Sequence, residues 1–341
     1  MLHLAFETSC DETSVALLKD NNVVMNLIYS QLEHQKFGGV VPEIASREHL
    51  KKIQPLTEKI FKETGKSINE LDFISATNEP GLIGALLIGL NYARALALAL
   101  DIPFVPVNHI HAHIYSAFLR KPSPEFPFIA LVVSGGHTLL VLVKDFFEHI
   151  ILGTTVDDAA GEAFDKVAKL LGLGYPGGPE ISRLAKEGNK NTYKFPVARL
   201  KQGSFNFSFS GIKTSVLYFL RDNNFQQPLD KKILSDICAS FQKSVVDSLY
   251  KNTLKALQKF NVKSLVISGG VSANYYLREK FLNLESDGYN IFIPPHEYTT
   301  DNAAMIGITG YYKFLYTKDK KFYELQSFAV PAKARLDFKN F

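Results

Sequence analysis

The feature of the sequence that most constrains its fold is a pair of apolar runs joined by a short polar turn, which occurs twice. The first copy spans residues 2–7 and 14–18, and the second spans residues 128–133 and 138–143. Two short apolar runs that flank a polar turn are typical of a β-hairpin. Because helical and strand patterns follow each copy, the recurrence predicts an α/β chain with a duplicated architecture.

The length of the chain fits two such lobes, since 341 residues are too many for one typical hydrophobic core. We predict an N-terminal lobe, residues 1–126, and a C-terminal lobe, residues 127–341, with a helical insertion at about 157–260. Further strands are expected at residues 23–29, 73–76, 103–107, 264–268 and 289–293, and helices at 42–64, 84–100, 157–171, 229–260, 273–282 and 300–316.

The composition is that of an ordinary globular protein. The hydrophobic fraction is 46% and the charged fraction 21%, which excludes disordered and fibrous classes. A net charge of +4 permits a polyanionic partner without requiring one. Cys10 and Cys238 are too few for a disulfide framework, and carboxylates at residues 7, 11 and 12 do not fit a signal peptide. We therefore expect a cytoplasmic protein.

One apolar run, residues 81–100, is about as long as a membrane-spanning helix. Asn91 and Arg94 interrupt it. This favours a packed helix of an α/β domain, with no association with a membrane.

Three of the nine histidines lie within five positions, at His109, His111 and His113. In a helix, His109 and His113 would project from one face toward one point, as a pair of metal ligands does. Ordinary buried histidines, or a strand with all three on one face, are the alternatives. Ile110 follows the first histidine, so the HExxH arrangement of metalloproteases is absent.

A strand that ends in Ser-Gly-Gly also occurs twice, at residues 131–136 and 265–270. Backbone amides beside glycines can approach an anion closely, because no Cβ blocks them. After the second copy, residues 271–274 open a predicted helix whose N-terminal end would favour a phosphate. An ordinary turn is the alternative interpretation of each copy.

This layout resembles the duplicated actin-like ATPase (ASKHA) fold, in which a ligand cleft lies between two lobes. A closer resemblance, collinear from residue 2 to about 310, is to the bacterial TsaD (YgjD) family of tRNA N6-adenosine threonylcarbamoyltransferases. It is carried by residues 7–13 (ETSCDET), 38–49 (GGVVPEIASREH), 79–86 (EPGLIGAL), 108–113 (NHIHAH), 133–138 (VSGGHT), 157–166 (DDAAGEAFDK), 175–179 (YPGGP), 207–214 (FSFSGIKT), 269–274 (GGVSAN) and 300–306 (TDNAAMI).

The resemblance implies one divalent metal ion, Fe(II) or Zn(II), bound by His109, His113 and Asp301. By composition alone, Asp301 would only cap a helix. The threonylcarbamoyl-adenylate would be bound by Val132, Val133, Ser134, Gly135, Gly136, Asp165, Gly178 and Asn274. Ser182 departs from the family, many of whose members carry Asp at this position beside the ligand.

The implied reaction transfers the threonylcarbamoyl group from the adenylate to N6 of adenosine 37, in tRNAs that read codons starting with A. It forms t6A and releases AMP. Asp11 and Glu12 are the candidates to accept the N6 proton, although by position they could form only a solvated turn. A TsaB-like paralogue and a TsaE-like P-loop ATPase are the implied partner proteins. The alternatives are a metalloprotease and a non-catalytic, actin-like nucleotide-binding partner.

Overall fold

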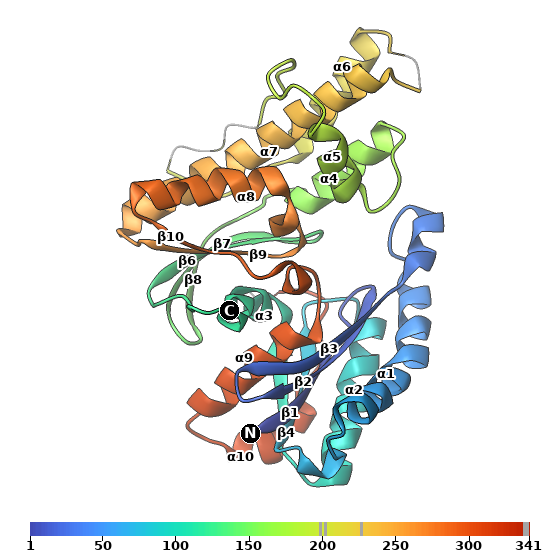
Figure 1. Ribbon diagram of the computed structural model, residues 1–341, viewed down its shortest axis with the longest axis vertical. Coiled ribbons are helices and arrows are strands. Elements are labelled where there is room, and N and C mark those ends of the chain that lie inside the picture. Colours follow the sequence, from blue (N-terminus) through green and yellow to red (C-terminus); the bar gives the residue numbers. More distant parts are fainter. Residues whose placement is uncertain (198–199, 201–202, 226–227, 337–340) are drawn as a thin grey trace. The chain divides into compact units, whose positions relative to one another are not determined.

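The computed structural model describes residues 1–197, 200, 203–225, 228–336 and 341. The chain divides into two compact units, each built around a five-stranded sheet (Figure 1). Unit 1 comprises Met1–Ser123 and Pro294–Phe341, and unit 2 comprises Pro124–Ile293.

The sheet of unit 1 has the strand order β3-β2-β1-β4-β5. Its first three strands form an antiparallel meander, and β4 and β5 extend the sheet in parallel on the other side of β1. The predicted N-terminal hairpin is therefore confirmed. The strands are β1 (Leu2–Glu7), β2 (Glu12–Lys19), β3 (Asn22–Ser30), β4 (Phe73–Glu79) and β5 (Phe104–Asn108).

Both faces of this sheet are covered by helices, and alternate residues of β1 belong to different cores. Leu4 and Phe6 are buried in a cluster with residues of α1 and α2. Ala5 is buried instead in a cluster with residues of α9. This alternation follows from the two-residue period of a strand. The helices of unit 1 are α1 (Pro42–Thr64), α2 (Ile83–Leu100), α3 (His109–Tyr115), α9 (Ala303–Tyr316) and α10 (Lys321–Glu324).

Helix α2 is the one helix in the described part of the chain that is long and apolar enough to cross a membrane. Its buried side chains include Leu86 and Leu90. The helix packs against β4 and α1. It is thus a packed helix of the α/β unit, as its interrupted apolar run predicts.

The sheet of unit 2 repeats the topology of unit 1, in the order β10-β9-β6-β7-β8. The strands are β6 (Phe128–Val133), β7 (Thr138–Asp145), β8 (Glu148–Thr154), β9 (Ser264–Ser268) and β10 (Asn290–Phe292). The edge strand β8 was not among the strands expected from the sequence. It is only partly buried, which weakens the apolar pattern that marks the other strands.

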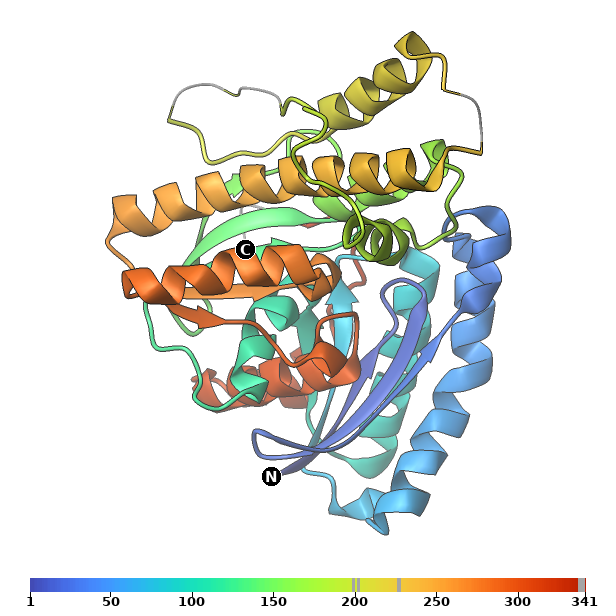
Figure 2. The same ribbon diagram turned by 45° about the horizontal axis from the view of Figure 1, so that its top comes forward.

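In the described part of residues 157–260, the predicted helical insertion corresponds to four helices, and α8 follows β9. In unit 2, α7 packs against α5 and α8 (Figure 2). The helices are α4 (Ala160–Leu170), α5 (Gly177–Ala185), α6 (Ser210–Asp222), α7 (Lys231–Phe260) and α8 (Tyr275–Leu282). Short 3-10 turns complete both units: η1 (Leu32–Phe37), η2 (Ile68–Glu70), η3 (Ser116–Leu119), η4 (Gly270–Ala273), η5 (Asn283–Asp287), η6 (His296–Tyr298) and η7 (Gln326–Ala329).

The division into units differs from the predicted domains at the C-terminal end, because residues 294–341 belong to unit 1. The cause is the docking of α9 on the first sheet. The backbone amide of Ala303 donates to Ser14 Oγ at 2.8 Å, and that of Ala304 donates to Asn26 Oδ1 at 3.2 Å. These contacts join segments that are far apart in the sequence, so the order of hairpins along the chain does not reveal them.

Candidate functional site

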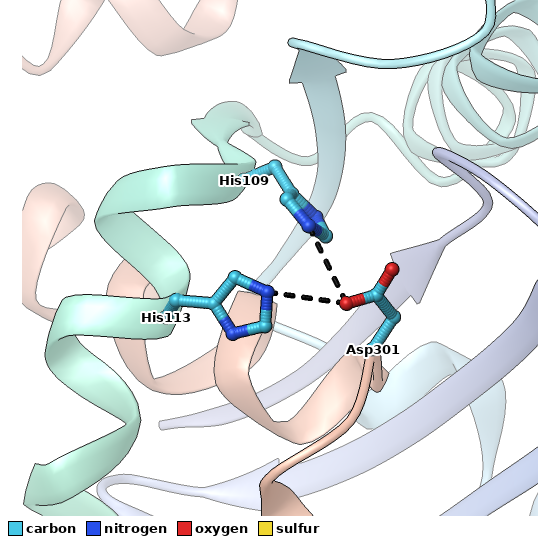
Figure 3. A group of neighbouring side chains, drawn as sticks. All are labelled: His109, His113 and Asp301. Carbon is cyan, nitrogen blue, oxygen red and sulfur yellow. Dashed lines mark ion pairs between the residues drawn. The ribbon is translucent and has the colours of Figure 1, made fainter. Parts of the chain in front are cut away.

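Three predicted metal ligands meet in unit 1. His109, His113 and Asp301 place one potential ligand atom each within 4.8 Å of one another. Figure 3 shows both imidazole rings turned toward the Asp301 carboxylate, whose Oδ1 lies 3.4 Å from His109 Nε2 and 3.1 Å from His113 Nε2. Both histidines are buried, and the aspartate side chain is 21% exposed. The chain thus offers two nitrogens and an oxygen at one partly accessible point.

Local sequence explains how the two histidines come to share a helix face. Strand β5 ends at Asn108, whose side-chain Oδ1 accepts hydrogen bonds from the amides of Ile110 at 2.9 Å and His111 at 3.2 Å. This cap starts α3 at His109. The predicted helix is therefore confirmed, and the alternative of a strand is excluded. His111 lies on α3 outside the ligand group and is half-buried.

The position of Asp301 is fixed by the start of α9. Asn302 caps that helix by accepting a hydrogen bond from the amide of Met305 at 3.0 Å. Asp301 therefore lies in the turn just before the helix, and α9 packs against α3 in the same unit.

A fourth residue, Glu7, contacts His109 on the ring nitrogen opposite the one that faces Asp301. It is the last residue of β1 and is fully buried. Its Oε2 lies 3.0 Å from His109 Nδ1 and accepts a hydrogen bond from Thr77 Oγ1 at 2.6 Å. Its Oε1 accepts from the amide of Ser9 at 2.5 Å. A carboxylate on the far nitrogen of a histidine orients the ring and favours a metal on the near nitrogen.

Burial and mutual attraction together set the pKa values of His109, His113 and Asp301. Burial lowers the pKa of His109, but the Asp301 and Glu7 carboxylates outweigh it and raise that pKa well above its usual value. Burial raises the pKa of Asp301, but His109 and His113 bring it well below its usual value. Burial lowers the pKa of His113 despite Asp301. The carboxylates therefore favour a positive charge at this point.

This donor set fits a transition metal. Two imidazole nitrogens and one carboxylate, with further positions open, are a known arrangement for iron and also suit zinc.

Asp11 ends the turn between β1 and β2, Glu12 is the first residue of β2 in the same unit, and both are half-buried. The pKa of Glu12 is raised well above its usual value by burial and by the like charges of Asp301 and Asp11. The negative charge of Asp301 therefore reaches Glu12.

The predicted adenylate-binding residues lie in unit 2. Val132 and Val133 end β6, and a tight turn follows in which the Ser134 amide donates to the His137 carbonyl at 2.8 Å. Gly135 and Gly136 are exposed, with open space where a side chain would begin. Their backbone is therefore open to close approach.

The start of α4 supports this turn. The amide of Gly161 donates to the Ser134 carbonyl at 3.2 Å. A Cβ on Gly161 would lie 2.5 Å from Ser134 O, so only glycine allows the helix to come this close. Gly269, at φ +87°, approaches the Val133 carbonyl in the same way and brings the ends of β6 and β9 together.

The remaining predicted residues make structural contacts of their own. Asp165 Oδ1 accepts from the amide of Gly177 at 2.7 Å, next to Gly178 in the first turn of α5. Asn274 caps α8 through the amide of Leu277 and donates to Gln242 Oε1 at 2.6 Å. Both side chains thus fix the start of a helix.

The sequence did not predict that Glu7 contacts the candidate metal ligand His109. A carboxylate that directly follows five residues of a buried strand is the signal that could have found it, because a charge in such a place needs a partner.

Comparison with known proteins identifies relatives along nearly the whole chain. A family model described as TsaD, tRNA N6-adenosine threonylcarbamoyltransferase, matches residues 22–308. A protein of that name from Fervidobacterium nodosum is 50% identical over 319 residues, which cover 91% of this chain and 92% of that protein. Another, from Dictyoglomus turgidum, is 50% identical and covers 94% and 95% of the two chains. A third, from Porphyromonas gingivalis, is 46% identical and covers 92% and 93%.

Solved structures of distant proteins share the fold. HypF from T. kodakarensis matches with a TM-score of 0.62 at 15% identity, covering 95% of this chain and 50% of that one. Component A of (R)-2-hydroxyglutaryl-CoA dehydratase from Acidaminococcus fermentans matches with a TM-score of 0.54 at 15% identity, covering 92% and 98%. At this identity the likeness concerns the fold alone, which is the predicted actin-like ATPase type.

Proposed function

Because the chain belongs to the TsaD family of tRNA N6-adenosine threonylcarbamoyltransferases, we propose that His109, His113 and Asp301 bind one divalent metal ion, Fe(II) or Zn(II), that its reaction requires. The observation that carries this proposal is the convergence of three ligand atoms, with the buried Glu7 carboxylate on the far nitrogen of His109. A carboxylate in this place is a common partner of a metal-binding histidine.

The chain is a transferase that acts on tRNA. It moves the threonylcarbamoyl group from threonylcarbamoyl-adenylate to N6 of adenosine 37, in tRNAs that read codons starting with A. The bond between the carbamoyl carbon and the phosphate oxygen breaks, and a bond between N6 and that carbon forms. AMP leaves with the electron pair of the broken bond, and N6 loses one proton.

The N6 amine of adenosine is a weak nucleophile, and water can hydrolyse the electrophilic threonylcarbamoyl-adenylate. When bound, the metal would supply a Lewis acid that polarises the carbamoyl oxygen. Asp11 or Glu12 would accept the N6 proton, since both carboxylates lie where β1 turns into β2, in the unit that also carries Asp301. The adenosine must leave the base stack of the tRNA to reach such a group.

Unit 2 would hold the leaving adenylate. In the Ser134–Gly135–Gly136 turn, which follows Val132 and Val133 at the end of β6, the exposed Gly135 and Gly136 would offer their backbone amides to the phosphate. Asp165, Gly178 and Asn274 would complete the adenylate site. Asp165 and Asn274 already form hydrogen bonds at helix starts in unit 2. Their side chains would therefore be held in place before the adenylate binds.

We propose that the enzyme works in the cytoplasm with a TsaB-like paralogue and a TsaE-like P-loop ATPase. Cys10 and Cys238 are free thiols, which suits a reducing compartment. Exposed Lys318, Lys320, Lys321 and Arg335 could contact the tRNA backbone. Lys333 in the same tail pairs with Glu79 at 3.2 Å, and Lys339 lies outside the described residues.

The test is t6A formation on unmodified tRNA, read by nucleoside mass spectrometry, with the partner proteins and preformed adenylate present. We expect product with wild type and none above background with His109→Ala. Equal product from both would reduce the histidines to structural residues. Cleavage of casein by the metal-loaded protein would instead favour the protease alternative, against which the Ile110 beside His109 argues.

A further inference from the structure

Three consecutive backbone carbonyls in the turn between β1 and β2 accept hydrogen bonds from residues elsewhere in the chain. The Ser9 carbonyl accepts from the amide of Leu82 at 2.8 Å, and the Asp11 carbonyl accepts from the amide of Gln31 at 3.2 Å. Between them, the Cys10 carbonyl accepts from His49 Nε2 at 2.9 Å. Two donors are backbone amides, and the third is a side chain that a substitution can remove.

His49 lies on α1 and is completely buried. A carbonyl oxygen can only accept, so the contact with Cys10 places the ring proton on Nε2. Nδ1 is then an acceptor, and Thr13 Oγ1 donates to it at 2.8 Å. Burial lowers the pKa of His49, which keeps the ring in the neutral form that these two contacts require.

A second set of polar contacts, centred on Gln31, also restrains the His49 ring. Gln31 Nε2 lies 3.4 Å from His49 Nδ1 and donates to the Ala45 carbonyl at 3.3 Å. Gln31 Oε1 accepts from His34 Nε2 at 2.8 Å, and His34 Nδ1 accepts from the amide of Val41 at 3.2 Å. The ring orientation of His49 is therefore set by a buried polar network beneath the acidic turn.

We propose that His49 is a positioning residue of the transfer reaction, which holds the Cys10 carbonyl and thereby orients the carboxylates of Asp11 and Glu12 toward the adenosine N6. This inference rests on the proposed role of those two acids. His49 acts only through the turn, so its loss affects the chemical step more than tRNA binding or metal binding.

The chain allows a matched pair of substitutions at this position. In His49→Gln the amide nitrogen reaches roughly to where Nε2 lies and can still donate to the Cys10 carbonyl. In His49→Asn the amide reaches only to about the position of Nδ1 and cannot. We expect His49→Asn to lower kcat by about 10- to 100-fold. His49→Gln should recover most of this loss, with the KM for tRNA and the bound metal per chain unchanged in both.

His3 provides a control for the cost of losing a buried histidine. It is also completely buried in unit 1, and its Nε2 contacts the Asp20 carbonyl at 2.9 Å. His3→Asn should lower the thermal unfolding midpoint and leave kcat of the folded enzyme unchanged. A loss of kcat in His49→Asn but not in His3→Asn would separate positioning from general destabilisation.

Two further variants separate this inference from the proposed function. If Asp11→Asn and Glu12→Gln lose activity while His49→Asn stays within about twofold of wild type, the positioning role is wrong and the role of the acids stands. Equal loss in His49→Gln and His49→Asn would also overturn it, because the donated hydrogen bond would then be irrelevant. If both acid variants keep the wild-type kcat, the proposed role of the acids is wrong and the inference falls with it.

Discussion

The two hairpin turns occupy equivalent places in two sheets of the same topology, yet they present opposite chemistry. The β1–β2 turn follows a buried carboxylate, Glu7, and carries Asp11 and Glu12. The β6–β7 turn follows Val133 and exposes Gly135 and Gly136. Carboxylates attract cations and accept protons, whereas exposed backbone amides attract anions. The two turns thus share a backbone plan, while their residues favour different ligands: a cation at the first turn and an anion at the second.

The two turns share one kind of support and differ in another. A glycine packs closely against each: a Cβ on Gly81 would lie 2.6 Å from Ser9 O, and one on Gly161 would lie 2.5 Å from Ser134 O. The first turn also has buried side-chain donors, since Thr77 donates to Glu7 and His49 donates to the Cys10 carbonyl. We therefore expect substitutions of these side chains to act through charge and hydrogen bonding, and a substitution of Gly161 to act through shape.

Removing a ligand from unit 1 should have the largest effect. Asp301→Ala leaves His109 and His113 without the carboxylate between them. We expect transfer to fall by more than about 100-fold, which is the upper end for residues that support a ligand indirectly. Steady-state t6A formation measures this, with metal content determined on the same samples. Transfer within tenfold of wild type would argue against the metal centre.

Loss of the supporting carboxylate should have a smaller effect. Glu7→Gln keeps the volume but removes the charge behind His109. Metal affinity should fall by about 10- to 100-fold. Competition with a chromogenic chelator measures it. Thr77→Val, which removes one hydrogen bond to Glu7, is the milder matched variant. Unchanged affinity in Glu7→Gln would show that the hairpins differ less than proposed.

Shape should matter in the second turn. A Cβ in Gly161→Ala would lie 2.5 Å from Ser134 O and 2.8 Å from Gly135 Cα, so the turn must shift. We expect about a tenfold higher KM for the adenylate, in line with an overpacking cost of ~1–3 kcal/mol. Bound metal should not change. Gly174→Ala in the same unit, where the added Cβ meets open space outside the proposed adenylate site, is the control for a glycine-to-alanine change. If Gly161→Ala instead loses metal, the division of roles between the turns is wrong.

The smallest effect on activity belongs to stability at low pH, to which His3 in unit 1 and the half-buried His149 in unit 2 contribute. Burial lowers the pKa of His3 and of His149 to about 4, from 6.5. Between these values the unfolded chain binds a proton that the folded chain does not, so stability falls as the pH drops from about 6.5 toward 4. For His3 the loss at pH 5 is up to ~2 kcal/mol.

Denaturant unfolding at pH 7 and pH 5 measures this dependence. The difference in free energy of unfolding between the two pH values should shrink in His3→Asn. A pH dependence identical to that of wild type would show that His3 is not a source of it.

Local patterns in the sequence account for much of the fold and for part of the site. Apolar runs indicated both hairpins, and the spacing of His109 and His113 indicated a ligand pair. Asp301 came only from the resemblance to a family, because a carboxylate before a helix is usually a cap. The adenylate residues and the acids Asp11 and Glu12 remain predictions of function that geometry alone does not test.

What the sequence did not reveal depends on contacts between distant segments. Glu7 gains its role only when β1 lies beside β4 and close to α3. Residues 294–341 join unit 1 because α9 docks on the first sheet. His49 reaches the Cys10 carbonyl from a helix that starts 32 residues later. Such contacts follow from sheet order and helix packing, which local periodicity does not encode.

The most direct test of the metal centre is to strip the purified enzyme with a chelator and then add Zn(II) or Fe(II) back in steps, measuring bound metal and t6A formation together. We predict that transfer vanishes on stripping, returns in proportion to bound metal and saturates at about one ion per chain, as expected for a single two-histidine, one-carboxylate site. Full transfer by the stripped enzyme would contradict the proposal that His109, His113 and Asp301 form a metal centre required for the reaction.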